Sequence, residues 1–325
     1  MTIVAAAILA SIPTACRESS SVATPTAPVD TGSRRIVCTI LPTYLFTRNL
    51  VVDVPGVEVR LLPLAAAGCP HDYELSLAHA KLIAAADVVV LNGGLERFAG
   101  EGIRRINSAA VQVEAWRDCI EATRHPPRAP HNAPSDAHHA HDSDDAGHPV
   151  HGSESVNPHV WLSPSLAMMQ VRTIAAALAG VLPHHRDRLR KNEEAYIQRL
   201  DALRLEVEAV RHRLRTRRIV TTHDAFEYLV RDLGLGVLAT IQPSPRIEPS
   251  AAEIARLVDM IRGGGAAAVF AEPGGSRVLA ERIARDSGVR AHLLDPIVSV
   301  EGEPALDHYE RVQRANLATL VEALR

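Results

Sequence analysis

Strand and helix patterns alternate along most of this 325-residue chain, which predicts an α/β fold built on parallel sheets. The alternation occurs in two series, one in each half of the chain. Between them lies a single long segment with helical periodicity, residues 184–216. The sequence therefore predicts two doubly wound (βα)4 lobes with parallel four-stranded sheets, joined by one long backbone helix.

The composition is that of a globular chain with an aliphatic core. Hydrophobic residues make up 46% of the chain, charged residues 22% and aromatic residues only 3%. A net charge of −3 argues against nucleic acid or an anionic membrane surface as the main partner. Histidine is the unusual residue, because seven of the 16 histidines lie within residues 125–151. This concentration points to metal binding.

Residues 1–16 have the pattern of a signal peptide. The apolar run at 3–12 is too short to span a bilayer, and Cys16 follows it. Residues 17–33 are rich in Ser, Thr and Pro and predict a flexible tether. The arrangement resembles a bacterial lipoprotein signal, although Pro13 stands where a Leu is expected. We expect export to the periplasm or the extracytoplasmic face of the membrane, with a lipid anchor at Cys16 as a further hypothesis.

The N-terminal lobe is expected to span residues 34–183. Its strands are predicted from apolar, β-branched runs, at 36–41, 57–64, 87–91 and 110–115. Helices are predicted after them, the first opening at Pro42 and the others at 75–86, 95–106 and 165–181. Residues 120–156 contain Pro, His, Asp and Ser without periodicity, so we expect a histidine-rich loop there.

The long helix is predicted from apolar residues that recur every seven positions, namely Leu189, Tyr196, Leu203 and Val210. A helix over 184–216 would be roughly 50 Å long, enough to run along both lobes. A coiled-coil dimer is the alternative, but Glu193 occupies the seam where an apolar residue is needed. We interpret the helix as intramolecular and expect a monomer.

The C-terminal lobe is expected to span residues 217–325, with the same alternation. Its predicted strands lie at 218–222, 236–241, 267–271 and 290–294, and its predicted helices at 225–233, 253–262, 278–287 and 308–324. Ligands of open parallel sheets bind beyond the carboxyl ends of the strands. Two such lobes therefore predict a binding cleft between them.

Four residues from distant segments follow a predicted strand or open a helix: His71, His159, His223 and Asp295. Taken singly, each is more often a structural residue. Together, three imidazoles and one carboxylate are a donor set that tetrahedral Zn²⁺ accepts. Because this set is rich in nitrogen, it favours Zn²⁺ over Mn²⁺.

These positions lie in motifs that resemble those of the cluster A-I solute-binding proteins, the zinc and manganese receptors of bacterial ABC importers. The motifs are Pro-His-Asp-Tyr-Glu at 70–74, Asn-Pro-His-Val-Trp-Leu at 157–162, Thr-Thr-His-Asp-Ala-Phe at 221–226 and Leu-Asp-Pro at 294–296. The resemblance covers about residues 34–325. It implies metal-ligand roles for His71, His159, His223 and Asp295, and an ABC permease and ATPase as partners.

The resemblance also draws attention to residues beside the predicted ligands. Glu272, in Phe-Ala-Glu-Pro, would lie near the metal as an outer-shell residue or an occasional ligand; a backbone cap is about equally expected. Cys69 stands where the family commonly has Asp, and we favour a packing role for it over a thiolate ligand. Whether Cys38 pairs with Cys119 is open, and a role for Cys38 as a small hydrophobic residue is favoured.

The clustered histidines are interpreted as an auxiliary metal loop: His138, His139, His141, His148 and His151. They would collect Zn²⁺ at low affinity and pass it to the cleft. The plainer alternative is a solvated spacer that binds metal incidentally.

The predicted function is that of an extracytoplasmic substrate-binding protein that captures Zn²⁺ between its lobes and delivers it to a membrane permease. A manganese or broader divalent-metal receptor of the same family is the alternative. A zinc-dependent hydrolase is less favoured, because Glu272 is the only candidate base and no His-Glu-x-x-His motif is present. We therefore expect no enzymatic activity.

Overall fold

The computed structural model describes residues 33–62, 75–96, 98–124, 156–242, 248–273 and 277–325. The expected signal peptide, tether and histidine-rich loop fall outside these ranges, except for the two ends of the loop segment. His71 and Cys69 also lie outside the described residues. The fold described below is that of the remaining chain.

The first sheet has four parallel strands in the order β2-β1-β3-β4. The strands are β1 (Arg34–Cys38), β2 (Val57–Leu61), β3 (Val88–Leu91) and β4 (Val111–Glu114). All four residues of β3 are buried, as expected for a central strand covered on both faces. The accompanying helices are α1 (Leu41–Leu50), α2 (Leu77–Ala84), α3 (Glu101–Ile106) and α4 (Cys119–Arg124).

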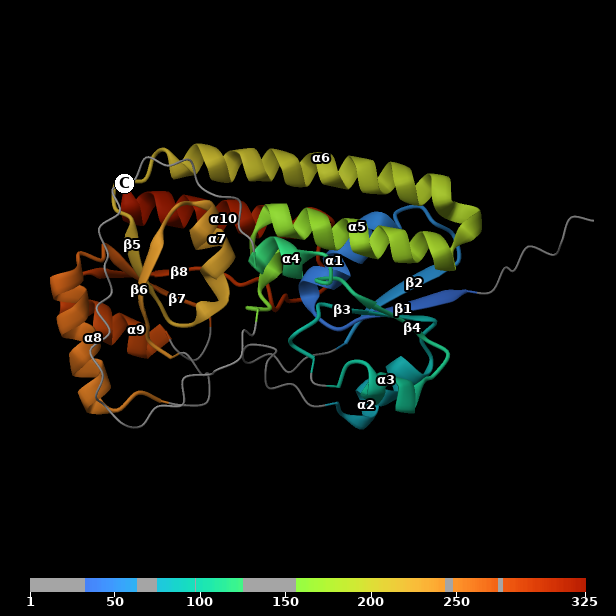
Figure 1. Cartoon of the computed structure of the whole chain (residues 1–325), viewed down its shortest axis with the longest axis horizontal. Coiled ribbons are helices and arrows are strands. Elements are labelled where there is room, and N and C mark those ends of the chain that lie inside the picture. The colour runs from blue at the N-terminus through green and yellow to red at the C-terminus, as the bar shows by residue number, and fades with distance from the viewer. Residues whose placement is uncertain (1–32, 63–74, 97, 125–155, 243–247, 274–276) are drawn as a thin grey trace, which may run out of the picture. The chain divides into compact units, whose positions relative to one another are not determined.

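The second sheet repeats this arrangement, with four parallel strands in the order β6-β5-β7-β8. Its strands are β5 (Arg218–Thr221), β6 (Gly236–Thr240), β7 (Ala268–Ala271) and β8 (Arg290–Leu293). Its helices are α7 (Glu227–Asp232), α8 (Ala251–Gly264), α9 (Arg277–Ser287) and α10 (His308–Leu324). The predicted fold class, two parallel four-stranded sheets with helices, is confirmed (Figure 1).

The two longest helices, α5 (Pro164–Val181) and α6 (Arg186–Arg211), pack side by side, and α6 also packs against α1 and α10 (Figure 1). The apolar stripe of α6 is buried, including Leu189, Tyr196 and Val210. This burial supports the intramolecular interpretation over a coiled coil. Helix α5 is long and apolar enough to cross a membrane, but half of it is buried in the core, which accounts for its composition.

Most element boundaries shift by a few residues, and the largest differences from the sequence prediction concern three helices. Helix α6 has 26 residues, about 39 Å, because a 3-10 turn occupies Pro183–His185 and the chain leaves the helix after Arg211. Residues 120–124, expected at the start of the loop, belong to α4. The predicted helix 95–106 is helical only from Glu101.

The late start of α3 follows from a tight turn after β3. Gly93 and Gly94 have φ angles of 95° and 75°, and a Cβ on either would lie within 2.5 Å of the Trp116 ring. The Glu96 carboxylate accepts hydrogen bonds from the N–H groups of Asn92 and Gly93, at 2.8 and 2.9 Å. These contacts hold residues 92–96 in a non-helical conformation.

Cys38 and Cys119 are free thiols, and both are buried. Burial raises the pKa of each thiol to about 12, so neither is a thiolate at neutral pH. The expected role of Cys38 as a small hydrophobic residue is confirmed by its complete burial in the core.

Candidate metal centre

Three of the predicted site residues follow neighbouring strands of the second sheet. His223 comes after β5, Glu272 after β7 and Asp295 after β8, and these strands are adjacent in the order β5-β7-β8. Backbone hydrogen bonds extend past the strands, from Thr222 to Phe270 at 3.0 Å and from Leu294 to Ala271 at 2.9 Å. The three side chains therefore start from the same sheet edge, which is where ligands bind in open parallel sheets.

The His223 ring is buried between two carboxylates. Its Nδ1 lies 3.4 Å from Oε1 of Glu272, and its Nε2 lies 3.1 Å from Oδ1 of Asp224. Burial lowers the pKa of His223, but the hydrogen bond and charge of Glu272 and the charge of Asp224 together raise it above its usual value. Glu272 thus lies in contact with a predicted metal ligand, and its role at the metal stays a prediction.

His159 is brought to the same place from a distant part of the chain. It immediately precedes a 3-10 turn, Val160–Leu162, and its side chain is fully buried. The His159 and His223 rings meet edge to face, with centroids 5.0 Å apart and planes at 85°. Two imidazoles that belong to the predicted ligand set therefore lie in direct contact.

Asp295 is fixed by hydrogen bonds on its own backbone and side chain. Its N–H donates to Oδ1 of Asn316, and its carbonyl accepts from Nδ2 of the same residue, both at 2.8 Å. The N–H of Ile297 donates to Oδ1 of Asp295 at 2.7 Å. Ile297 has a φ of 59°, which is strained for a β-branched residue, so this turn is held by its surroundings.

The electrostatics at this edge favour a cation. Burial raises the pKa of Asp295, and the charge of Glu272 raises it further, against the hydrogen bond from Ile297 and the charge of His308. The negative charge of Glu272 therefore disfavours the ionisation of Asp295. A divalent ion placed beside them would offset this repulsion.

Within the described ranges, no three His, Cys, Asp or Glu side chains form a group that could hold a metal ion. The structure brings together His159, His223 and Glu272, and places Asp295 at the same sheet edge. His71 and Cys69 lie outside the described residues, so the complete ligand set stays a prediction.

The residues that fix the segment after His159 were not predicted from the sequence. The Tyr309 hydroxyl donates to the carbonyl of Trp161 at 2.6 Å, and Gln313 donates to the carbonyl of Leu162 at 3.0 Å. In turn, the Trp161 indole N–H donates to the carbonyl of Pro296 at 2.8 Å. The only sequence signal was the i, i+4 spacing of Tyr309 and Gln313 on α10, which by itself indicates no partner.

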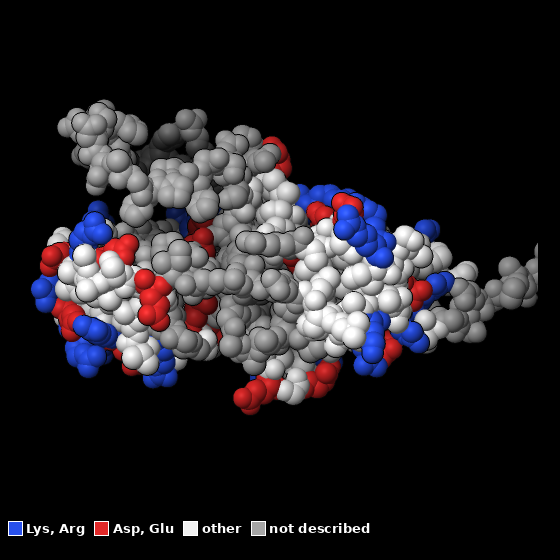
Figure 2. Space-filling view, turned by 90° about the horizontal axis from the view of Figure 1, so that it is seen from below, with Lys and Arg blue, Asp and Glu red and all other residues white. Residues whose placement is uncertain are grey.

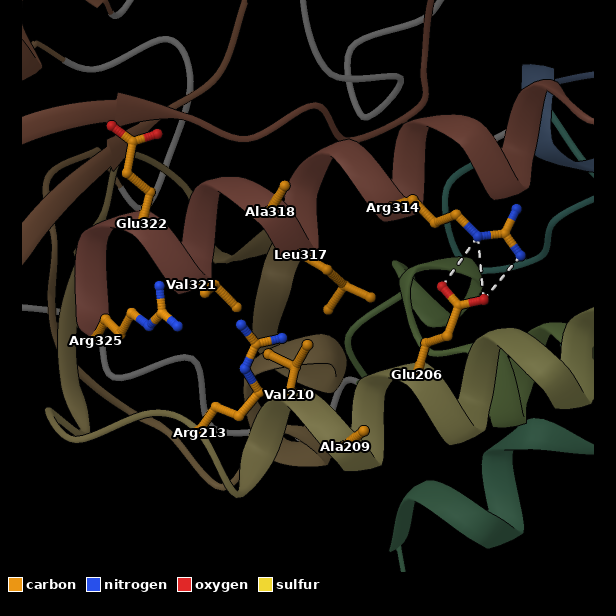
Figure 3. A pocket seen from close by; sticks show the side chains of 10 residues that line it. All are labelled: Glu206, Ala209, Val210, Arg213, Arg314, Leu317, Ala318, Val321, Glu322 and Arg325. Atoms are coloured by element: carbon orange, nitrogen blue, oxygen red, sulfur yellow. Dashed lines mark hydrogen bonds and ion pairs between the residues drawn. The ribbon is translucent and has the colours of Figure 1, made fainter.

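A groove of about 630 Å³ lies between α6 and α10. Its floor includes Leu317 and Val321, and its polar lining consists of arginines and glutamates, with Arg314 paired to Glu206 at 2.9 Å (Figure 3). It contains none of the predicted metal ligands, so it is not the predicted site.

On another face, basic and acidic side chains are interspersed over the described surface, in keeping with the small net charge (Figure 2).

Comparisons with known proteins agree with this architecture. The chain is 30% identical over 292 residues to the zinc-binding lipoprotein AdcA of Streptococcus pneumoniae, a match that covers 89% of this chain and 55% of AdcA. The chain thus spans about half the length of that relative.

Solved structures show the same fold over almost the whole chain. The substrate-binding protein FpvC of Pseudomonas aeruginosa, solved in complex with Mn²⁺, is 31% identical with a TM-score of 0.69, covering 90% of this chain and 98% of FpvC. A crystal structure of ZnuA is 25% identical with a TM-score of 0.71, covering 90% of this chain and 100% of ZnuA. A family model matches residues 36–323. The chain therefore belongs to the ZnuA family, described as zinc-uptake complex component A, periplasmic.

Proposed function

We propose that this chain is the zinc-binding receptor of an ABC importer and that it carries Zn²⁺ as cargo to a membrane permease. The observation that carries the proposal is the direct contact of His159 with His223, together with Oε1 of Glu272 at 3.4 Å from Nδ1 of His223. Buried imidazoles beside carboxylates form a strong site for a divalent metal. Membership of a zinc-uptake family supports the same conclusion.

The proposed ligands are His71, His159, His223 and Asp295, with Glu272 as an outer-shell residue or an additional ligand. Three nitrogens favour Zn²⁺, and Zn²⁺ also exceeds Mn²⁺ in intrinsic affinity for such donors. Manganese is the second candidate cargo, because the similar protein FpvC has been solved with Mn²⁺.

The proposed mechanism is capture and release, without chemical turnover. His71 and His159 are assigned to a lobe ending at residue 183, and His223 and Asp295 to a lobe beginning at 217. A metal ion held by both sets would tie the lobes together, and the permease would distinguish the tied state from the open one. With four protein ligands the metal has no open position for an activated water, so we propose no enzymatic activity.

The proposed location is outside the cytoplasm, because the N-terminal residues have the pattern of an exported lipoprotein. Attachment through a lipid on Cys16 would keep a monomeric receptor near its permease and ATPase. The histidine-rich loop would supply Zn²⁺ to the cleft.

The test is zinc affinity, measured on purified protein by competition with a chelator of known affinity. We expect His159→Ala and His223→Ala each to weaken zinc binding at the cleft by more than the ~10–100-fold cost of losing an outer-shell partner. His212→Ala is the matched control, since His212 is an exposed histidine just after α6. Wild-type affinity in both site variants would refute the proposed site.

A further inference from the structure

Asn157 has both polar atoms of its side chain, and its backbone carbonyl, hydrogen-bonded at the junction between the two predicted metal ligands. Its Oδ1 lies 3.0 Å from the backbone N of His159 and 2.7 Å from Nδ1 of the His159 ring. Its Nδ2 lies 2.9 Å from the carbonyl of Asp224 and 2.8 Å from Oε2 of Glu227. Its own carbonyl accepts from the Tyr228 hydroxyl at 2.8 Å.

These partners determine the orientation of the Asn157 amide. A backbone carbonyl and a carboxylate only accept hydrogen bonds, so the group facing Asp224 and Glu227 must be the NH₂ of Asn157. The oxygen therefore faces His159, where the backbone N–H donates to it. A flipped amide would set two donors against each other at the backbone and two acceptors against each other at Asp224 and Glu227.

The amide orientation in turn determines the tautomer of His159. Because Oδ1 of Asn157 can only accept, Nδ1 of His159 must carry the proton that points to it. The lone pair of the neutral ring then lies on Nε2, the nitrogen that becomes available as a metal donor.

The same amide connects His159 to the segment that carries His223. Asp224 follows His223 directly, and Glu227 and Tyr228 belong to the first turn of α7. One side chain thus fixes one predicted ligand and bonds to the backbone next to the other. The spacing of the two rings is therefore set partly by Asn157.

We propose that Asn157 is a positioning residue of the metal site: it selects the His159 tautomer that donates through Nε2 and holds His159 in register with His223. This role rests on the proposed zinc-binding function for its purpose. The tautomer itself is a property of the metal-free protein and is measured without zinc.

The first experiment is nitrogen-15 NMR of the His159 imidazole in metal-free, full-length protein at about pH 8.5, where histidine is neutral. Wild-type protein should show His159 protonated on Nδ1. Asn157→Ala should shift the ring to a mixture rich in the Nε2-protonated form. Asn107→Ala is the matched control, because Asn107 also bonds backbone groups on both sides of its amide, within the first lobe. A wild-type ring protonated on Nε2 would overturn the proposal without any variant.

The second experiment measures zinc affinity in the same proteins. Asn157→Ala should weaken binding by ~10–100-fold, the range for lost outer-shell partners, while Asn107→Ala leaves it unchanged. The double variant Asn157→Asp with Glu227→Gln restores an acceptor toward His159 and a donor toward residue 157, but it sets a carboxylate oxygen against the carbonyl of Asp224. It should therefore recover the Nδ1 tautomer and only part of the affinity.

The outcomes distinguish a failure of the positioning role of Asn157 from a failure of the proposed zinc site. Loss of affinity in His159→Ala together with wild-type affinity and tautomer in Asn157→Ala would overturn the positioning role alone. Wild-type affinity in both variants would overturn the proposed zinc site, and with it the purpose of the positioning.

Discussion

At the scale of single residues, the site is organised around the balance of charge at His223. Burial favours the neutral ring, while Glu272 and Asp224 favour the protonated ring, and the carboxylates prevail. In the proposed site, zinc and protons would compete for the same nitrogen of His223, so the raised pKa of this ring should make zinc binding sensitive to mild acid.

The sign of the pH dependence follows directly. The protein should bind zinc with its full affinity at pH values above the pKa of His223. The affinity should fall as the pH drops through this pKa, and the fall should begin above pH 6.5, because the pKa is raised from that usual value. Glu272→Gln removes the carboxylate that contributes most to raising the pKa of His223, so the midpoint of the affinity loss should move to lower pH. Chelator competition from pH 8 to pH 5 measures the midpoint, with Glu322→Gln, in the groove remote from the site, as control. A midpoint that is unchanged or higher in Glu272→Gln would contradict this account.

Sequence patterns identified the site residues at strand ends but not the residues whose hydrogen bonds hold the site in place. His223 and Asp295 were predictable because a polar residue after a buried strand lies at the ligand-binding edge of a parallel sheet. Asn157 and Tyr309 were not, because their roles depend on hydrogen bonds to segments far away in the chain, such as Asp224 and Trp161. No local pattern records such partners.

At the scale of elements, the 3-10 turn Val160–Leu162 joins the site to the core. Its side chains are all buried, and α10 satisfies two of its carbonyl groups through Tyr309 and Gln313. Buried carbonyl groups are costly to leave without a donor, so α10 stabilises the turn that follows His159.

This dependence predicts different effects for two conservative substitutions. Tyr309→Phe should lower the free energy of unfolding by about 1–3 kcal/mol, because the carbonyl of Trp161 loses its donor in a buried position. Tyr196→Phe should leave it unchanged or slightly higher, since the buried Tyr196 hydroxyl has no hydrogen-bond partner among the described residues. Urea denaturation of both variants measures the difference. Equal effects would show that the hydrogen bond to Trp161 contributes nothing.

The elements were predicted best where a single physical cause dominates. Apolar β-branched runs predicted all eight strands found in the part of the chain that the structure describes, with shifts of a few residues at their ends. The long helix was predicted to extend to 216, but α6 ends at Arg211. Leu214 is buried, but it lies beyond the helix, where the next residues bond to the carbonyl of Leu324 instead. Tertiary contacts, not periodicity, ended the helix.

At the scale of the whole molecule, the first sheet's helix α1 is bonded to the segment between β8 and α10. The Tyr44 hydroxyl donates to Glu303 at 3.0 Å, and Asn49 donates to the carbonyl of Leu306 at 2.9 Å. Together with the packing of α6 against α1 and α10, these bonds should limit the motion of one predicted lobe against the other to a small tilt.

The histidine-rich tract gives a separate prediction at this scale. Removing residues 125–151 should reduce the number of zinc ions bound per chain and slow the loading of the cleft, because seven histidines are lost. The affinity of the cleft site should stay unchanged. Metal analysis and stopped-flow zinc transfer from a weak chelator measure both effects. Unchanged stoichiometry and loading rate would exclude the collector role.

The proposed function requires that Zn²⁺ binds in the cleft through histidine nitrogens. Its most direct test is zinc X-ray absorption of the protein lacking residues 125–151, loaded with one equivalent of Zn²⁺ in the presence of excess Mn²⁺. We expect one bound zinc with nitrogen and oxygen donors at about 2.0–2.1 Å, three of them imidazoles, and loss of two imidazoles in the His159→Ala, His223→Ala double variant. A sulfur donor at about 2.3 Å, or an unchanged imidazole count in the double variant, would contradict it.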